Sequence, residues 1–320
     1  MAAPPKEKQS SKATTSSSSR AATAPPPREP YPWRRTLFGC LVVFLCWGIG
    51  IHREYPDSVN ARFKTAQHWV FSRLWTVVSG HNSERLLPFR ETLWAQVRGN
   101  VLELGPGYAD ALTLFKRPIS HYVALEPNMF LHPTLAENAR KSGFSVHYDS
   151  DTTSPAASET MQKPQPQGVP VLAIVNGTLD AAIPQYVADH APYDYVITSL
   201  VLCSVDSVQA NLEAIQALLR PGGKYVFIEH VHHTDAEDLT LDAESSKEGG
   251  MDVARWRMVQ SVVSRFLWPF TGNCHFDRDT GIMLKAMDGW SSVDFKTSRL
   301  ASSVLSKMTP LIYGTATKSL

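Results

Sequence analysis

Short apolar runs alternate with amphipathic stretches through the central and C-terminal parts of the chain. The apolar runs have the length of buried strands and cover residues 101–104, 121–125, 169–175, 193–202 and 224–231. Two stretches between them, 135–142 and 207–219, have helical character, and the second stops at the helix-breaking sequence Arg220-Pro-Gly-Gly223. Strands that alternate with helices predict an α/β fold with a mostly parallel sheet. We expect this folded domain to cover residues 83–320, beginning with a helix over 84–97.

The N-terminal part has a different pattern. Residues 1–33 are mostly Ala, Pro, Ser, Thr and Lys, which predicts a disordered tail. Residues 34–53 contain the uncharged apolar stretch 36–51, about 24 Å long as a helix and shorter than the ~30 Å hydrocarbon core of a bilayer. We interpret it as a membrane anchor that spans a thin membrane or lies in one leaflet. A buried helix of a soluble protein is the alternative.

Two further segments have apolar residues at helical spacing. Residues 54–82 predict an amphipathic linker helix, in which Trp69 and Trp75 border an apolar stripe. This helix either rests on a membrane interface or packs on the folded domain. Residues 251–270 predict a helix that acts as a lid over a substrate pocket or simply packs, with one apolar face made of Trp256, Val259, Val263, Phe266 and Phe270. Residues 149–168 are polar, contain three prolines and predict an exposed insertion.

Composition and charge narrow the function only slightly. The chain has 320 residues, of which 43% are hydrophobic and 19% charged, as expected for a globular enzyme. Its net charge of +1 gives no indication of a nucleic-acid partner. The four cysteines, including the distant Cys203 and Cys274, show neither zinc-ligand spacing nor a disulfide framework. The sequence His230-Val-His232-His233 lacks an accompanying cysteine or carboxylate cluster, so no metal site is predicted.

The candidate chemistry lies in residues 101–110. This stretch predicts a buried strand, a turn at Gly105 and Gly107, and a helix from about Ala109. Asp110 stands where a dinucleotide-binding turn has its third glycine, and Glu103 adds an acidic group that disfavours an anionic pyrophosphate. Both carboxylates suit S-adenosylmethionine, which carries an ammonium and a sulfonium. Glu126 ends the next strand, 21 residues after Gly105, where an acidic side chain accepts hydrogen bonds from ribose hydroxyls.

Several sequence blocks between residues 100 and 318 carry a resemblance to a known family. They are Leu102-Glu-Leu-Gly-Pro-Gly107, Leu125-Glu-Pro-Asn128, Leu200-Val-Leu-Cys-Ser-Val205, Leu219-Arg-Pro-Gly-Gly223, Phe227-Ile-Glu-His-Val231, Gly272-Asn-Cys-His275 with Arg278-Asp-Thr280, and Pro310-Leu-Ile-Tyr-Gly314. The chain resembles the class I S-adenosylmethionine-dependent methyltransferases. Within them it is similar to the methyltransferase-like protein 7 family of membrane-anchored thiol methyltransferases.

The resemblance implies a Rossmann-like sheet of seven strands with the last strand antiparallel, its final two strands lying at 293–295 and 311–317. It also implies an anchor in the endoplasmic reticulum or lipid droplets, and we expect the catalytic domain to face the cytosol. The glycine motif departs from the family pattern, because Ala109 occupies its third position.

The resemblance further implies which residues hold the cofactor. Glu103, Gly105 and Gly107 would hold the methionine end, Glu126 the ribose, and Thr178 and Leu179 the adenine. Thr178 stands where many relatives carry an acidic adenine contact. The full set of predicted cofactor-binding residues is Glu103, Gly105, Pro106, Gly107, Glu126, Pro127, Thr178, Leu179, Asp180 and Leu200.

Methyl transfer needs proximity, alignment and a dry pocket more than elaborate catalytic groups. A thiol acceptor with a pKa near ~8.5 is already partly ionised. His230 and His275 are the candidate general bases. We therefore expect methyl transfer to a small lipophilic acceptor, a thiol. The alternatives are an O-, N- or C-methyltransferase acting on a lipid, quinone or secondary metabolite, and a non-catalytic membrane adaptor that keeps the fold.

Overall fold

The computed structural model describes residues 56–149, 168–180, 182–232, 253–267, 272–298 and 309–320. The chain divides into two compact units, residues 1–60 and 61–320, and the architecture below is that of the second unit. The predicted tail and anchor, and nearly all of the predicted insertion, lie outside the described residues. Within the described ranges, no helix has the length and apolar character needed to cross a membrane.

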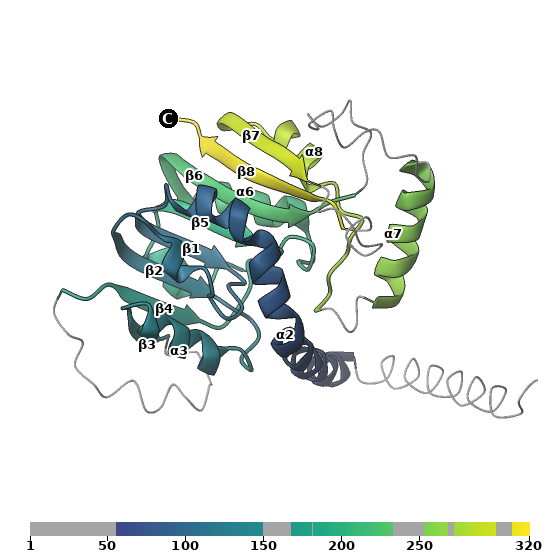
Figure 1. Cartoon of the computed structure of the whole chain (residues 1–320), viewed down its shortest axis with the longest axis horizontal. Coiled ribbons are helices and arrows are strands. Elements are labelled where there is room, and N and C mark those ends of the chain that lie inside the picture. The colour runs from purple at the N-terminus through teal and green to yellow at the C-terminus, as the bar shows by residue number, and fades with distance from the viewer. Residues whose placement is uncertain (1–55, 150–167, 181, 233–252, 268–271, 299–308) are drawn as a thin grey trace, which may run out of the picture. The chain divides into compact units, whose positions relative to one another are not determined.

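An eight-stranded sheet forms the centre of the second unit, in the order β3-β4-β2-β1-β5-β6-β8-β7 (Figure 1). β8 runs antiparallel to both of its neighbours, β6 and β7, and the other adjacent strands of the sheet pair in parallel. This confirms the predicted mostly parallel α/β sheet with an antiparallel last strand. The strands are β1 Gly99–Leu104, β2 Ile119–Leu125, β3 Ser145–Tyr148, β4 Val171–Val175, β5 Tyr193–Ser199, β6 Leu219–His230, β7 Trp290–Ser298 and β8 Leu311–Lys318.

The prediction of seven strands is wrong by one, because β3 adds a strand at the edge of the sheet. Its four residues bury only Val146 and Tyr148. A strand of four residues with this alternation is too short to be distinguished from a loop by its sequence. The pairing of β3 with β4 supplies the missing information, and it joins segments on either side of the insertion.

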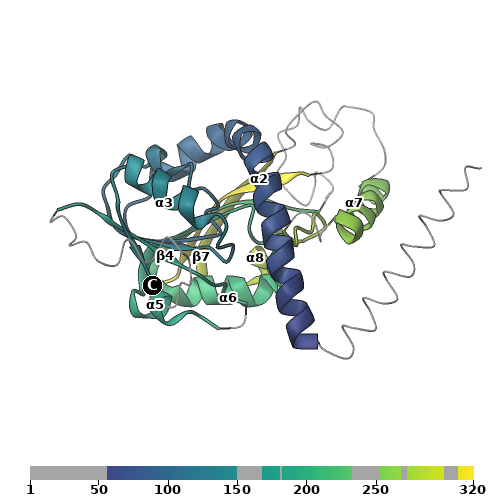
Figure 2. The same cartoon turned by 90° about the horizontal axis from the view of Figure 1, so that it is seen from below.

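Helices cover both faces of the sheet (Figure 2). On one face, Leu86 and Trp94 of the long N-terminal helix and Leu135 pack on the strands. On the other face, Leu212 and Ile215 do so. The helices are α2 Pro56–Trp94, α3 His132–Lys141, α5 Gln185–Asp189, α6 Val208–Leu218, α7 Val253–Leu267 and α8 Thr280–Ala286.

The connection from β1 to β2 does not contain the predicted helix. Beyond the glycine turn there is only the 3-10 turn η1, Leu112–Leu114. Ala109 has a φ of 54°, a left-handed conformation that cannot begin an α-helix, and Pro118 soon ends the segment. The expected helix N-terminus is therefore absent from this site, and the backbone N–H groups that reach it come from the turn itself.

The amphipathic face of α2 is reversed relative to the prediction. Gln67, Ser72 and Ser79 are each only 8% exposed, whereas the apolar side chains of Leu74 and Val77 are 38% and 78% exposed. The helix is also continuous from Pro56 to Trp94, so it joins the two helices predicted on either side of residue 83. Two hydrogen bonds described below, at the backbone oxygen of His68 and the hydroxyl of Thr76, join this side of the helix to the loops after β1 and β2.

Helix α7 turns most of its predicted apolar face inward, together with a polar residue that the prediction did not include. Gln260 is fully buried and its amide donates to the carbonyl oxygens of Val231 and Phe276 (3.2 and 2.9 Å). Trp256, Val259 and Val263 are half-buried as the sequence predicts. The placement of Phe266 on that face is wrong, because its side chain is 73% exposed, and Phe270 lies outside the described residues. The backbone carbonyls that Gln260 satisfies fix the rotation of this helix.

Candidate active site

The carboxylate of Glu126 lies at the carboxyl end of β2 and is held by two backbone groups. The N–H of Gly107 donates to its Oε2 (3.0 Å), and the N–H of Asn128 donates to its Oε1 (2.8 Å). The imidazole of His132 donates from Nε2 to the backbone oxygen of Glu126 (2.8 Å). Burial raises the pKa of the Glu126 carboxyl to about 7, against the two backbone N–H groups. Each carboxylate oxygen has a second lone pair, so the group can accept further hydrogen bonds.

Glu103, near the end of β1, is the second buried carboxylate. It accepts a hydrogen bond from the hydroxyl of Tyr122. Burial raises its pKa to about 7, while the nearby guanidinium of Arg90 acts in the opposite direction. Arg90 belongs to α2 and donates from one terminal nitrogen to the hydroxyl of Ser199 at the end of β5 (3.0 Å). This places a cation and a carboxylate together below the glycine turn.

The glycine turn is crowded by neighbouring elements. Gly105 and Gly107 have φ angles of +55° and +61°, a region that favours glycine. A Cβ on Gly105 would lie 2.9 Å from a methyl group of Val201, and one on Gly107 would lie 3.1 Å from Nε1 of Trp75. The turn therefore contacts both the loop after β5 and helix α2.

Further hydrogen bonds fix α2 over this edge of the sheet. The side-chain amide of Asn128 donates to the backbone oxygen of His68 (3.0 Å), and the hydroxyls of Thr76 and Tyr108 lie 3.1 Å apart. Of the two alternatives for the linker helix, the structure thus shows packing on the folded domain for residues 68–76. The apolar residues on the other side of the helix remain exposed.

Two buried donors at this edge have no hydrogen-bond partner among the described residues, namely Nε of Arg90 and Nε1 of Trp75. Unpartnered buried donors of this kind are costly unless a ligand satisfies them. S-adenosylmethionine presents a carboxylate that accepts from such donors, an ammonium that suits Glu103, and ribose hydroxyls that suit Glu126. The residues present therefore fit this cofactor, which supplies an activated methyl group on its sulfonium sulfur.

The carboxylate of Asp180 accepts hydrogen bonds from groups of the protein itself. Its Oδ1 accepts hydrogen bonds from the backbone N–H of Asp206 (2.9 Å) and the side-chain amide of Asn211 (2.7 Å). Both partners lie at the N-terminal end of α6. The carboxylate thus tethers the loop after β4 to α6, and its contact to the cofactor stays a prediction.

The other predicted cofactor residues lie at the same edge of the sheet, and their contacts to a cofactor stay predictions. Thr178 is exposed and Leu179 is buried in the loop after β4. Leu200, after β5, has a φ of +62° and donates its N–H to the backbone oxygen of Ile228 (2.8 Å). The carbonyl of Pro106 accepts from the N–H of Ala109 (2.8 Å), and Pro127 is half-buried beside Glu126.

The two candidate bases have different surroundings. His230 is the last residue of β6, and its Nδ1 lies 3.7 Å from Sγ of Cys274. His275 donates its backbone N–H to the oxygen of Cys203 (2.8 Å), and its ring lies 3.3 Å from the side-chain oxygen of Asn273. Burial, followed by the charge of Arg278, lowers the pKa of His275. A general-base role for either histidine stays a prediction.

Sequence reasoning missed several residues that form this site. Trp75 and Arg90 come from α2, and Tyr122 comes from the middle of β2. Cys203 and Cys274 are 71 residues apart in sequence, yet their sulfur atoms are 3.0 Å apart. Asn128, Cys203 and Cys274 carried a sequence signal, because they belong to blocks that support the family resemblance, but the blocks do not show which residues meet. The remaining pairs form through tertiary contacts that no local spacing records.

The chain is similar in sequence to known methyltransferases. A sequence profile described as "Methyltransferase domain" matches residues 78–271. The thiol S-methyltransferase TMT1B of Homo sapiens is 27% identical over 173 residues, covering 50% of this chain and 58% of the relative. TMT1B of Rattus norvegicus is 33% identical over 88 residues, covering 27% and 29%. The chain thus spans less than two thirds of the length of either relative. A solved structure of the N-methyltransferase NodS from Bradyrhizobium japonicum is 10% identical, covers 76% of this chain and 97% of its own, and has a TM-score of 0.42.

The sheet and its carboxylate-lined edge fit a domain that binds S-adenosylmethionine. The profile match covers more than half of the residues, and the chain belongs to the family of methyltransferase domains.

Proposed function

We propose that this protein transfers the methyl group of S-adenosylmethionine to the thiol of a small lipophilic acceptor. The observation that carries the cofactor part is the Glu126 carboxylate, which is buried, bound to the turn at Gly107 and still able to accept ribose hydroxyls. The similarity to thiol S-methyltransferases supports the thiol as acceptor.

The chain's own residues supply binding and exclusion of water. Glu103, Arg90 and Glu126 fix the polar groups of the cofactor, and the segment of α2 around Trp75 covers the glycine turn. Such positioning contributes more to a displacement at a methyl carbon than acid-base chemistry does. A thiol acceptor with a pKa near ~8.5 needs little help to ionise.

Membrane association is part of the proposal. Exposed apolar side chains line the outer sides of α2 and α7, and a groove of about 510 Å³ is bordered by Ala66, Trp69 and Phe130 among other residues. Apolar faces flanked by basic residues suit a membrane interface, where a lipophilic acceptor is concentrated. By resemblance, the membrane is that of the endoplasmic reticulum or lipid droplets, with the domain in the cytosol.

The test is methyl transfer from labelled S-adenosylmethionine by the detergent-solubilised full chain. Alkyl thiols, phenols, amines and a lipid extract are the acceptors, and Glu126→Ala is the variant. Label on thiols alone, lost in the variant, supports the proposal. Label on another acceptor class replaces the thiol with an O-, N- or C-acceptor. Absence of cofactor binding in calorimetry would instead favour the non-catalytic adaptor.

A further inference from the structure

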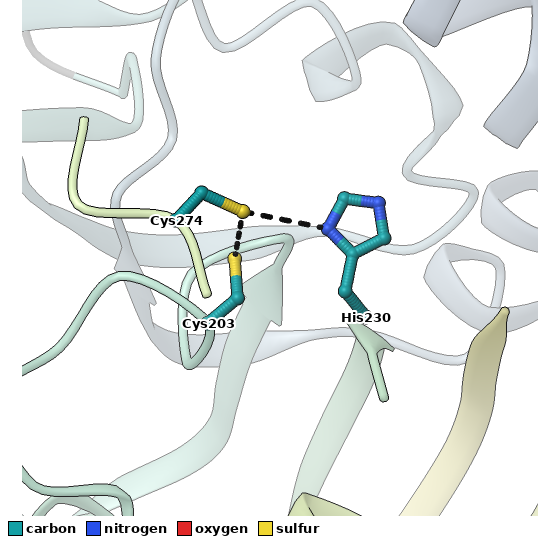
Figure 3. A group of neighbouring side chains, drawn as sticks. All are labelled: Cys203, His230 and Cys274. Carbon is teal, nitrogen blue, oxygen red and sulfur yellow. Dashed lines mark hydrogen bonds between the residues drawn. The ribbon is translucent and has the colours of Figure 1, made fainter. Parts of the chain in front are cut away.

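Cys203, His230 and Cys274 form a compact cluster at the carboxyl edge of the sheet (Figure 3). Cys203 lies in the loop after β5, His230 ends β6, and Cys274 lies in the segment after α7. The two sulfur atoms are 3.0 Å apart, and Sγ of Cys274 is 3.7 Å from Nδ1 of His230. The three ligand atoms lie within 4.8 Å of one another. The cysteines are 1% and 9% exposed.

We propose that this cluster is a Zn²⁺ site with three protein ligands and one open position. Zinc prefers thiolate and imidazole ligands in a tetrahedron, with bonds of about 2.3 Å to sulfur and about 2.0–2.1 Å to nitrogen. These bonds place two sulfurs about 3.8 Å apart and a sulfur and a nitrogen about 3.6 Å apart. The 3.7 Å sulfur–nitrogen distance already matches. The sulfurs need to separate by less than about 1 Å, which a small side-chain rotation provides.

The surrounding contacts hold the ligands in place without the metal. The N–H of His275 donates to the oxygen of Cys203 (2.8 Å), which ties together the two segments that carry the cysteines. The side-chain amide of Asn273 adds a second tie to the oxygen of Ser204 (2.8 Å). Phe276 packs edge-on against the His230 ring, with 5.3 Å between centroids. Ligands fixed by their neighbours in this way favour metal binding.

A disulfide between the cysteines is the competing use of the same pair. It requires the sulfurs to approach to about 2.05 Å and involves no third group. Nδ1 of His230 lies 3.7 Å from Sγ of Cys274, the separation expected of two ligands of one zinc ion. A metal site explains this approach, whereas a disulfide does not. The metal is therefore the better account of all three side chains.

The open position would take the acceptor thiol, an inference that rests on the proposed function. Three protein ligands and an exchangeable fourth are typical of catalytic zinc, and a coordinated thiol loses its proton.

The thiol proton passes to solvent, and a sulfur lone pair forms a bond to the methyl carbon. The bond between that carbon and the sulfonium sulfur breaks, and its electron pair stays on the departing sulfur. The neutral thioether product binds zinc weakly and leaves. In the sheet, β5 lies between β1 and β6. The cluster carried by the ends of β5 and β6 therefore lies at the same edge of the sheet as the glycine turn that follows β1.

The metal site is tested with the full chain, reduced, stripped with a chelator and titrated with Co²⁺ in the absence of cofactor and acceptor. We expect one equivalent to give thiolate-to-cobalt charge-transfer absorption and visible d–d bands, displaced by Zn²⁺. Cys203→Ser and Cys274→Ser should lose the charge-transfer absorption at least in part, and His230→Gln should bind at least tenfold more weakly. Cys40→Ser/Cys46→Ser is the matched control and should behave as wild type.

Two outcomes overturn the metal site. One is that the reduced wild type develops no thiolate-to-cobalt absorption although its circular dichroism spectrum shows a folded protein. The other is that Cys203→Ser, folded by the same criterion, gives the full wild-type spectrum.

The role of the open position is tested by adding an alkyl thiol to the cobalt-loaded protein without cofactor. A shift of the d–d bands supports thiol coordination, and unchanged bands overturn it. Undiminished thiol methylation by the metal-free protein also overturns it. If cobalt binds but no thiol is methylated under any condition, the proposed function fails while the metal site stands.

Discussion

Individual buried residues give the site its chemistry. Glu126 and Glu103 are each 5% exposed, and burial raises both carboxyl pKa values to about 7. The positive charge of Arg90 only partly offsets the effect of burial on the pKa of Glu103. For Glu126, burial is opposed only by the two backbone N–H groups. Carboxyls of this kind exchange protons near neutral pH, so ligand binding at this site is expected to depend on pH.

Cofactor affinity should increase as the pH rises through about 7. Glu126 accepts hydrogen bonds at both carboxylate oxygens only when ionised, so each pH unit below its pKa costs up to about tenfold in affinity. Titration calorimetry with S-adenosylhomocysteine between pH 6 and 8, in buffers of different ionisation enthalpy, measures both the affinity and the proton release. Glu126→Gln should bind more weakly and with a flatter dependence. A variant slope equal to that of the wild type would contradict this role.

Gly107→Ala should lower both stability and cofactor affinity. The residue has a φ of +61°, and its new Cβ would press on Trp75 at 3.1 Å. Gly143→Ala is the matched control, because Gly143 has a φ of +88° but nothing within 4 Å of its Cβ position. The control should lose about 1 kcal/mol of stability through backbone strain alone and keep its affinity. Equal loss of affinity in both variants would show that Trp75 does not limit the space at the turn.

At the scale of elements, two helices expose apolar residues while burying polar ones. In α7, Met258, Val262 and Phe266 are 63%, 50% and 73% exposed, whereas Gln260 and Ser264 are buried. The hydroxyl of Ser264 accepts from the N–H of Phe276 (2.8 Å), so the polar face is fixed by backbone groups that need partners. The apolar residues are left for another surface, which the proposal assigns to a membrane.

Replacing Met258, Val262 and Phe266 of α7 with glutamine should weaken binding to lipid vesicles. Because the side chains are exposed, the free energy of unfolding should change by less than about 1 kcal/mol. Flotation of full-length wild type and variant with phosphatidylcholine vesicles, with and without anionic lipid, measures the effect. Replacing the exposed Lys141 of α3 with glutamine is the control. Equal flotation of all three proteins would exclude α7 from the membrane interface.

Asp180→Ala should destabilise the fold while leaving cofactor affinity within about threefold of wild type. The variant removes the acceptor for Asp206 and Asn211 at the start of α6, and Asn211 is buried. Leaving these donors unpaired should cost about 1–3 kcal/mol, measurable by urea unfolding. A large loss of affinity with unchanged stability would instead support the cofactor-binding role that the sequence analysis predicts for Asp180.

For the whole molecule, buried titratable groups have opposite effects on how the free energy of unfolding depends on pH. Burial lowers the pKa of His121 to about 4, so its contribution to stability increases as the pH rises from about 4 to its ordinary value of 6.5. Glu103 acts in the other direction. Its folded-state pKa of about 7 exceeds the ordinary 4.5, so the folded protein holds a proton that the unfolded chain has lost.

The free energy of unfolding of the wild type should therefore fall, relative to that of Glu103→Gln, as the pH rises from about 5 to about 8. The wild type should lose about 3 kcal/mol at most over this range compared with the variant, in which the group does not titrate. Urea unfolding of both proteins without cofactor at pH 5, 6, 7 and 8 gives the difference. Parallel pH profiles would show that Glu103 is ionised in the folded protein throughout.

Much of the fold follows from local sequence pattern. The apolar runs predicted β1, β2, β4, β5 and β6, because a strand buried on both faces must be apolar along its length. The glycines before and after Pro106 and the strand-end position of Glu126 likewise predicted a ligand-binding edge. The start of the folded domain at residue 83 stays a prediction, although α2 runs through this position.

Other features depend on contacts between distant segments. Nothing near Gln260 in sequence shows that its partners are the carbonyls of Val231 and Phe276, so its burial and the exposure of Phe266 could not be predicted. The same holds for the approach of Cys203 to Cys274. The sequence by itself determined the alternating α/β elements and the acidic strand ends, because strand burial and turn conformation are local constraints. Only the tertiary structure decided which helix faces turn inward and which cysteines meet, because buried backbone groups and packing across the sheet edge impose those choices.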